Sequence, residues 1–210
     1  MKIRRLTLLL TAILVVTPVA GSAQVYDAPS FRPPDSERGV GFYAVSLAPG
    51  DDLGDDVAAL ATWRMPGSDL DLGLRAGAGD IGGDLALLGG IEVERGLVAG
   101  GEDAPVSVAW TSGMGVGTVP ERDAARIRIP AGVTLGRGIP MEGYVLLPYA
   151  HPRLAVDFFV RRDPPGGPGD EADLNFDLDL GADVVFDEGW RLRFGVTLGS
   201  SEAVGFGVGL

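Results

Sequence analysis

Apolar and polar residues alternate along most of the chain after residue 37. In residues 173–184, every even-numbered position is apolar and every odd-numbered position is Asn, Asp or Gly. Because successive side chains of a β-strand point to opposite faces, this alternation predicts a strand. The same pattern recurs over residues 38–48, 57–65, 69–79, 85–95, 106–118, 126–137, 144–160, 190–199 and 202–210. We therefore expect about ten strands.

Segments rich in Gly, Pro and Asp separate these strands and predict turns or loops. They include APGDDLGDD after the first strand, GIPMEG, RDPPGGPGDEAD, and FDEG before residue 190. Pro148 and Pro152 fall inside the long segment 144–160, where proline cannot donate a ladder hydrogen bond. We expect that strand to begin near Tyr149 or to bend there.

The composition of the polar face decides between fold classes. The strands of a soluble sandwich or a soluble barrel also alternate apolar and polar residues, so this alternation alone does not distinguish a soluble β-protein from a membrane barrel. Here the polar face is mostly Gly interspersed with Asp and Arg, which suits a narrow lumen in which large side chains share space. An even number of strands of about ten residues is typical of membrane barrels. We predict an all-β, closed antiparallel up-and-down transmembrane β-barrel over residues 38–210, with about ten strands and eight also possible.

The first 23 residues have the pattern of an export signal. Lys2, Arg4 and Arg5 precede an apolar run over residues 6–20, and small residues lead to a cleavage position after Ala23. The run is shorter than the roughly 20 residues that a membrane-spanning helix needs. We expect residues 1–23 to be a cleaved signal peptide and residues 24–37 to be a flexible leader.

The net charge of the chain limits the classes of partner that it can bind. The formal net charge is −12, which becomes about −15 without the three basic residues of the signal. This argues against nucleic acid or an anionic membrane surface as a partner, since binding to either rests on positive charge. Lysine is absent after Lys2, so the remaining cations are arginines. A GC-rich genome would explain this bias, and so would enclosed arginines that pair with carboxylates through their planar donors.

The chain resembles the small outer-membrane β-barrel proteins of Gram-negative bacteria. The resemblance rests on the signal, the strand pattern, the stretch LLPYAHPRLAVDFF and the apolar last strand, and it covers residues 38–210. It implies outer-membrane lipid and the barrel-assembly machinery as partners. It also implies that both termini face the periplasm, with the acidic loops APGDDLGDD and RDPPGGPGDEAD outside. The family commonly ends in Phe or Trp, whereas this chain ends in Leu210.

The inward face of the predicted barrel is charged. Across the FDEG turn, we expect Asp183 nearly opposite Arg191, with Asp179 and Arg193 within diagonal reach. Such charges could form a constriction that selects solutes, or they could pair and plug the lumen, since unpaired buried charge is costly. We favour the plug, because about ten strands leave less room than a porin of 16–18 strands. The predicted lumen charge network comprises Asp71, Arg75, Glu92, Glu94, Arg126, Arg128, Arg153, Asp157, Asp177, Asp179, Asp183, Arg191 and Arg193.

Two tryptophans flank short turns on the apolar face. Trp63 precedes PGS, and Trp190 follows FDEG. Both turns should lie at the same end of the barrel, so we expect Trp63 and Trp190 to form an aromatic girdle at one headgroup level.

Catalytic and metal-binding motifs are weak. His151 is the single histidine, and Ser107 and Ser112 have no nucleophile motif around them, so we expect His151 to be a hydrogen-bonded lumen residue and the protein not to be an enzyme. One histidine and no cysteine argue against zinc. DDLGDD lacks the spacing of a calcium loop, and the glycine runs are not followed by helices. We expect no cofactor and no metal.

The sequence therefore predicts an outer-membrane β-barrel of structural or interaction type with a charged, largely plugged lumen. Two alternatives remain open at this stage. The first is a small-solute diffusion channel of the same fold. The second is a soluble secreted or periplasmic β-sandwich or ligand-binding barrel.

Overall fold

The computed structural model describes residues 32–34, 39–47, 56–81, 83–101, 104–120, 124–161, 171–200 and 202–210. The predicted signal peptide, most of the predicted leader, and most of both acidic loops lie outside these residues. Within them the chain forms β1 (Gly39–Leu47), β2 (Asp56–Met65), β3 (Asp71–Ile81), β4 (Asp84–Val98), β5 (Ser107–Val119), β6 (Ala124–Gly136), β7 (Ile139–Met141), β8 (Tyr144–Arg161), β9 (Glu171–Phe186), β10 (Arg191–Gly199) and β11 (Ala203–Gly209).

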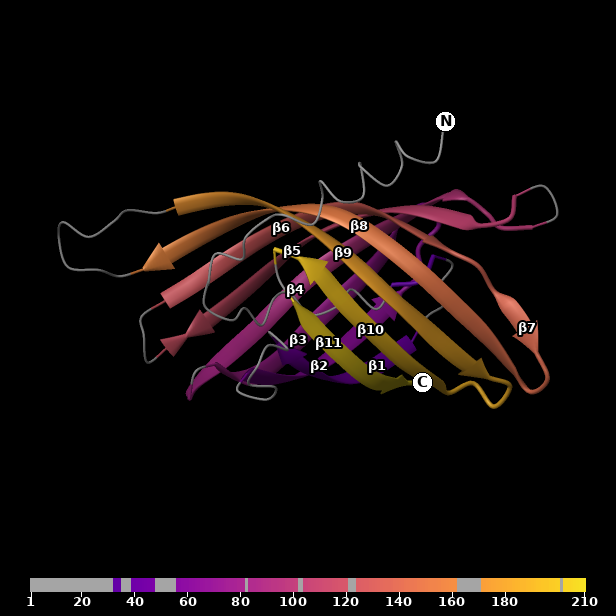
Figure 1. The fold of residues 1–210 in the computed structure, drawn as a ribbon, viewed down its shortest axis with the longest axis horizontal. Coiled ribbons are helices and arrows are strands. Elements are labelled where there is room, and N and C mark those ends of the chain that lie inside the picture. Colours follow the sequence, from indigo (N-terminus) through magenta and orange to yellow (C-terminus); the bar gives the residue numbers. More distant parts are fainter. Residues whose placement is uncertain are drawn as a thin grey trace, which may run out of the picture.

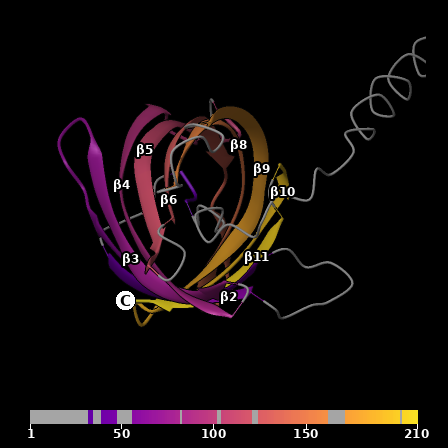
Figure 2. The ribbon, with the colours of Figure 1, turned by 90° about the vertical axis from the view of Figure 1, so that its left-hand side faces the viewer.

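The ten long strands close into a ring (Figures 1 and 2). Each pairs antiparallel with the next long strand, and β1 pairs with both β2 and β11, so that no long strand is left as an open edge. This confirms the predicted all-β, closed antiparallel up-and-down barrel of about ten strands. Within the described ranges, no helix has the length and apolar character needed to cross a bilayer.

The seam between the first and last strands follows the predicted alternation. Phe42 lies opposite Val208, and Ala44 lies opposite Phe206, on the outer face of the barrel. Glycines of β11 occupy the inner face, where Gly207 lies against the ring of Tyr43. A side chain at that glycine would collide with the ring, so glycine is needed for β1 and β11 to approach.

The proline-containing strand begins at Tyr144, not near Tyr149. Both prolines lie inside this strand, β8, with Pro148 opposite Ala182 and Pro152 opposite Leu178 of β9. The ladder between β6 and β8 is interrupted opposite Pro152, so the missing donor there removes no ladder bond. The GIPMEG segment, predicted as a turn, contains the short strand β7, which also pairs with β8.

The FDEG turn sets a different register from the predicted one. The Phe186 N–H donates to the Trp190 carbonyl at 3.0 Å, and the two rings stack with centroids 3.9 Å apart. Gly189 adopts a φ of 91° inside this turn, which glycine tolerates without strain. As a result, Asp183 lies directly opposite Arg193 and diagonal to Arg191, so the expected placement of Asp183 nearly opposite Arg191 is wrong. Asp179 lies opposite Thr197 and is not within the expected diagonal reach of Arg193.

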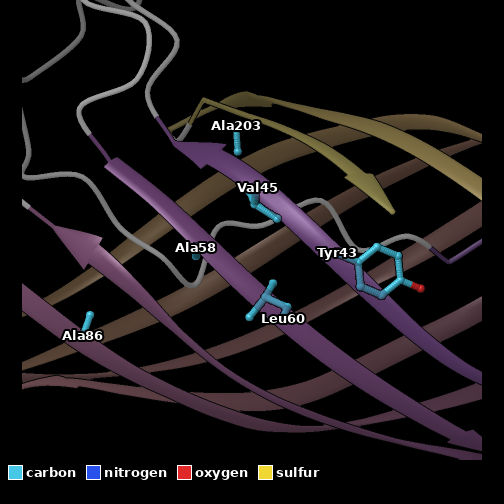
Figure 3. Packing of buried hydrophobic residues seen from close by; sticks show 6 residues of the cluster. All are labelled: Tyr43, Val45, Ala58, Leu60, Ala86 and Ala203. Atoms are coloured by element: carbon cyan, nitrogen blue, oxygen red, sulfur yellow. The ribbon is translucent and has the colours of Figure 1, made fainter. Parts of the chain in front are cut away.

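The outer and inner faces of the barrel differ in chemistry. Every long strand exposes a large apolar side chain on the outside: Phe42, Trp63, Leu72, Leu87, Trp110, Ile129, Leu154, Phe176, Phe194 and Phe206. On the inside, one part of the wall carries an apolar cluster (Figure 3) of Tyr43, Val45, Ala58, Leu60, Ala86 and Ala203. The rest of the interior is largely polar and charged.

Three residues of the predicted flexible leader lie inside the barrel. Arg32, Pro33 and Pro34 are buried, and they are the short indigo segment within the ring of strands in Figure 2. The Thr134 hydroxyl donates to the Arg32 carbonyl at 2.7 Å. These three residues thus add to the filling of the lumen.

The charged lumen as candidate functional site

The residues of the predicted lumen charge network lie at inward-facing positions on six strands: β3, β4, β6, β8, β9 and β10. Asp71, Arg75 and Glu92 are half-buried, and the other ten members are buried. Asp71 lies at one end of the barrel, where its carboxylate accepts the Gly67 N–H at 2.9 Å. Arg191 lies at that same end of β10, opposite Gly209.

Asp179 is the centre of the first cluster. Its Oδ2 accepts from Arg153 Nε at 2.9 Å and its Oδ1 from Arg153 Nη2 at 3.2 Å. Thr197 Oγ1 donates to Oδ1 at 2.7 Å, and His151 Nδ1 lies 3.1 Å from Oδ2. The carboxylate is 0% exposed, so its charge depends on these donors in place of water.

His151 links this cluster to β5. Its Nε2 lies 2.7 Å from Thr111 Oγ1, which completes a chain of hydroxyl, imidazole and carboxylate in the order found in nucleophilic triads. Asp179 is also held by Arg153, and the Thr111 and His151 side chains are buried. The arrangement therefore positions His151 as a hydrogen-bonded residue of the lumen. Ser107 and Ser112 bond elsewhere, to the Gly100 N–H and the Pro130 carbonyl.

The second cluster joins β6, β8 and β9. Arg126 donates to Asp157, and Arg128 donates to Asp177. Arg128 Nη1 also lies 3.5 Å from Asp157 Oδ2, and Asn175 Nδ2 donates to the same oxygen at 2.5 Å. Arg126 thus faces a carboxylate on the neighbouring strand β8, and Arg128 reaches carboxylates on β8 and, one strand further, on β9. Such pairing makes buried charge tolerable.

The third cluster joins β9, β10 and β1. Arg193 Nε donates to Asp183 Oδ2 at 2.7 Å, and its Nη1 donates to the Tyr43 hydroxyl. Thr62 Oγ1 donates to the same hydroxyl at 3.4 Å. Arg193 thus connects the charged strands to the apolar cluster that contains Tyr43.

The fourth cluster contains a residue that sequence reasoning missed. Arg75 Nη2 donates to Glu92 Oε1 at 2.5 Å, while Arg32 Nε lies 3.4 Å from Glu92 Oε2 and 3.3 Å from Glu94 Oε2. Arg32 Nη1 also donates to the Val93 carbonyl at 3.2 Å. The available signal was the pair of inward-facing glutamates on β4, which outnumber the predicted cation Arg75 on the neighbouring strand.

The two tryptophans of the predicted girdle lie on the outside at one end of the barrel. Trp63 pairs with Val40, whose backbone exchanges hydrogen bonds of 3.0 and 2.8 Å with Leu210. Trp190 precedes β10 at that same end, where Arg191 pairs with Gly209. Trp63 is 50% exposed and Trp190 is 38% exposed.

The described side chains suggest no metal centre. Within the described ranges, no group of three or more His, Cys, Asp or Glu residues is placed to hold a metal ion. The carboxylates of the lumen are instead engaged by arginines, which leaves ion pairing as the main chemistry of the interior.

Comparisons with known proteins add little. No family model matches the chain, and no curated protein matches it. Among solved structures, one described as “KdgM porin” is 9% identical with a TM-score of 0.37 and covers 81% of this chain and 97% of that chain. Another, described by the words “Unveiling the Mechanism Behind the in-meso Crystallization of Membrane Proteins”, is 8% identical with a TM-score of 0.40 and covers 83% of each chain. Both similarities are too low to bear on function.

Proposed function

We propose that this chain is an outer-membrane β-barrel protein of structural or interaction type, with a lumen plugged by paired charges. The main support is that charged side chains fill the interior. Four aspartates are 0% exposed, and each forms an ion pair with an arginine: Asp157, Asp177, Asp179 and Asp183. Side chains held in such pairs leave little free passage for a solute, because moving one of them leaves a buried charge without its partner.

The outer face supports a lipid environment. Large apolar side chains are exposed on all ten long strands, and a continuous exposed apolar surface of this kind marks a contact with membrane or protein. A closed barrel also satisfies its backbone hydrogen bonds internally, as hydrocarbon requires. Trp63 and Trp190 fit an aromatic girdle at one membrane boundary. The proposal includes export of the chain through its predicted signal peptide and insertion into the membrane by the barrel-assembly machinery.

Conductance of the refolded protein in planar bilayers tests the plug. We expect no stable unitary conductance at neutral pH. Stable unitary steps would contradict the plugged lumen and would show that the protein is a small-solute diffusion channel. Before the recording, heat-modifiable migration on SDS gels must show that the inserted protein is folded, so that a silent bilayer reports a closed lumen.

The location of arginine substitutions on β9 tests the membrane assignment. Leu180 and Leu174 both face outward, Leu180 near the middle of β9 and Leu174 near its start. In lipid vesicles, Leu180→Arg should lower the free energy of unfolding by about 2–4 kcal/mol, and Leu174→Arg by only about 0–1 kcal/mol. Equal small effects, together with partitioning of the protein into the aqueous phase, would favour the soluble ligand-binding barrel.

A further inference from the structure

A small cavity lies inside the barrel between the glycine-rich wall and a group of arginines. Its volume is about 70 Å³. One water needs roughly 10–15 Å³ of such space, so the cavity has room for several waters or for one small polyatomic ion. Its lining includes Arg32, Arg75, Gly90, Gly115, Arg128 and Arg153.

The cavity follows from one cross-strand row of residues. Arg75 of β3 pairs with Gly90 of β4, Gly90 pairs with Gly115 of β5, and Gly115 pairs with Arg128 of β6. All four positions face inward. A Cβ placed on Gly115 would meet no atom closer than 4.0 Å, so open space lies above this glycine. Two arginines therefore flank a gap that two adjacent glycines leave unfilled.

The charges at the cavity wall are predominantly positive. Arg128 and Arg153 are held by Asp177 and Asp179, but neither of these carboxylates is among the cavity-lining residues. Glu92 does line the cavity, and it is bound by Arg75. Four arginines and one carboxylate therefore line the open space.

Two residues that line the cavity carry buried donors without acceptors. Within the described part of the chain, Arg32 Nη2 and Arg75 Nε make no hydrogen bond, and Arg32 is only 2% exposed. Leaving a buried N–H of a charged group without an acceptor is costly, and such groups are normally satisfied. An anion with two or more oxygen atoms would supply acceptors to several of these donors at once, since guanidinium geometry matches carboxylate and phosphate.

We propose that this cavity binds a small oxyanion, of the size of acetate or inorganic phosphate, over Gly90 and Gly115. Arg75 and Arg128 hold it from the two sides, and Arg32 contributes donors from the segment that enters the lumen. The site requires only the closed barrel, so it stands independently of where the protein resides and of whether the lumen conducts.

Calorimetric titration of the full chain, refolded in a neutral detergent, tests the site. Sodium acetate and sodium phosphate are the probes, and sodium chloride at equal ionic strength and sodium benzoate are the references. Saturable binding of acetate or phosphate is expected, and benzoate should not bind because its ring exceeds the cavity. Absence of saturable binding by both probes, or equal binding of benzoate, overturns the proposal.

Cavity filling localises the binding. Gly115→Val places methyl groups in the open space without a backbone collision, so it should fold and lose acetate and phosphate binding. Ala131→Val is the matched control, because Ala131 is an exposed outward-facing residue of β6, and it should bind as the parent does. Unchanged binding by a folded Gly115→Val protein contradicts the proposed location.

Charge removal gives an independent readout should Gly115→Val fail to fold. The double variant Arg75→Gln with Glu92→Gln removes one cation and one anion from the cavity wall, and it also removes the contact of Glu92 with Arg32. Because the Arg75 donors to the bound anion are lost, Kd should rise by about tenfold or more. The matched double variant Arg193→Gln with Asp183→Asn neutralises a pair that does not line the cavity, and its Kd should match the parent's. Equal Kd values for both double variants would refute the role of Arg75.

Discussion

One part of the lumen wall is lined by buried charges, whereas another part of the same ring is lined by small and apolar side chains. The charged wall consists of Arg126, Arg128, Arg153, Asp157, Asp177, Asp179, Asp183 and Arg193, on β6, β8, β9 and β10. The apolar wall consists of Tyr43, Val45, Ala58, Leu60, Ala86 and Ala203, on β1, β2, β4 and β11 (Figure 3).

The residues of both walls are buried, but burial places different constraints on them. A residue of the apolar wall needs only to fill volume next to its neighbours, as Val45 does at 2% exposure. A residue of the charged wall needs a partner of opposite charge at hydrogen-bond distance, as Asp179 has in Arg153. The charged wall should therefore behave as a network in which the effects of substitutions are coupled, whereas the apolar wall should tolerate changes of similar shape and polarity.

Breaking the centre of the charged wall should have the largest effect. Asp179→Ala removes the acceptor of Arg153, His151 and Thr197 and leaves the buried Arg153 guanidinium with only the more distant Asp177 carboxylate, 3.9 Å away. The free energy of unfolding, measured by urea titration in detergent, should fall by about 3–5 kcal/mol. Asp71→Ala, at the half-buried end of the network, is the control and should cost about 0.5–1.5 kcal/mol. Similar costs for the two variants would contradict a paired network at Asp179.

Replacing a whole pair should convert part of the charged wall into apolar wall. Asp183→Leu and Arg193→Met each leave one buried charge without its partner, whereas the double variant leaves none. The double variant should be more stable than the more damaging single variant, with a coupling energy of about 0.5–3 kcal/mol in a double-mutant cycle. Strictly additive costs would show that Asp183 and Arg193 do not depend on each other.

Exchanging polarity at constant shape should have the smallest effect. Thr197→Val removes the donor to Asp179, and Val45→Thr buries a hydroxyl in the apolar wall. Each should lower the free energy of unfolding by about 1–3 kcal/mol. Val196→Ile, on the outer face of β10, is the control and should stay within about 0.5 kcal/mol. If the free energy of unfolding of Val45→Thr also changes by less than about 0.5 kcal/mol, water or a hydrogen-bond acceptor reaches the apolar wall despite its burial.

Much of the fold could be predicted because it depends on local geometry. The period-2 alternation that defines β9 in residues 174–184 follows from the pleat of a single strand, so the face on which Asp177 lies is decided by its position in the chain. The same argument applies to the last strand, where Phe206 faces outward and Gly207 faces Tyr43. The strand number and the closure of the barrel followed from the repetition of this pattern.

The partners inside the lumen could not be predicted in the same way. Asp183 meets Arg193 because the turn from Phe186 to Trp190 sets the register of β9 and β10, and the number of turn residues alone did not specify it. Arg32 meets Glu92 and Glu94 because a segment without any periodicity enters the barrel.

By itself, the sequence determined the ten long strands and which of their side chains face inward, since the alternation of side chains follows from the geometry of an extended backbone. Only the tertiary structure decided which charges pair and where space remains. The row from Arg75 through Gly90 and Gly115 to Arg128 exists because four strands pair in one register, although these residues are far apart in the chain. Pairing and cavities depend on register and curvature, which arise only when the ring of strands has closed.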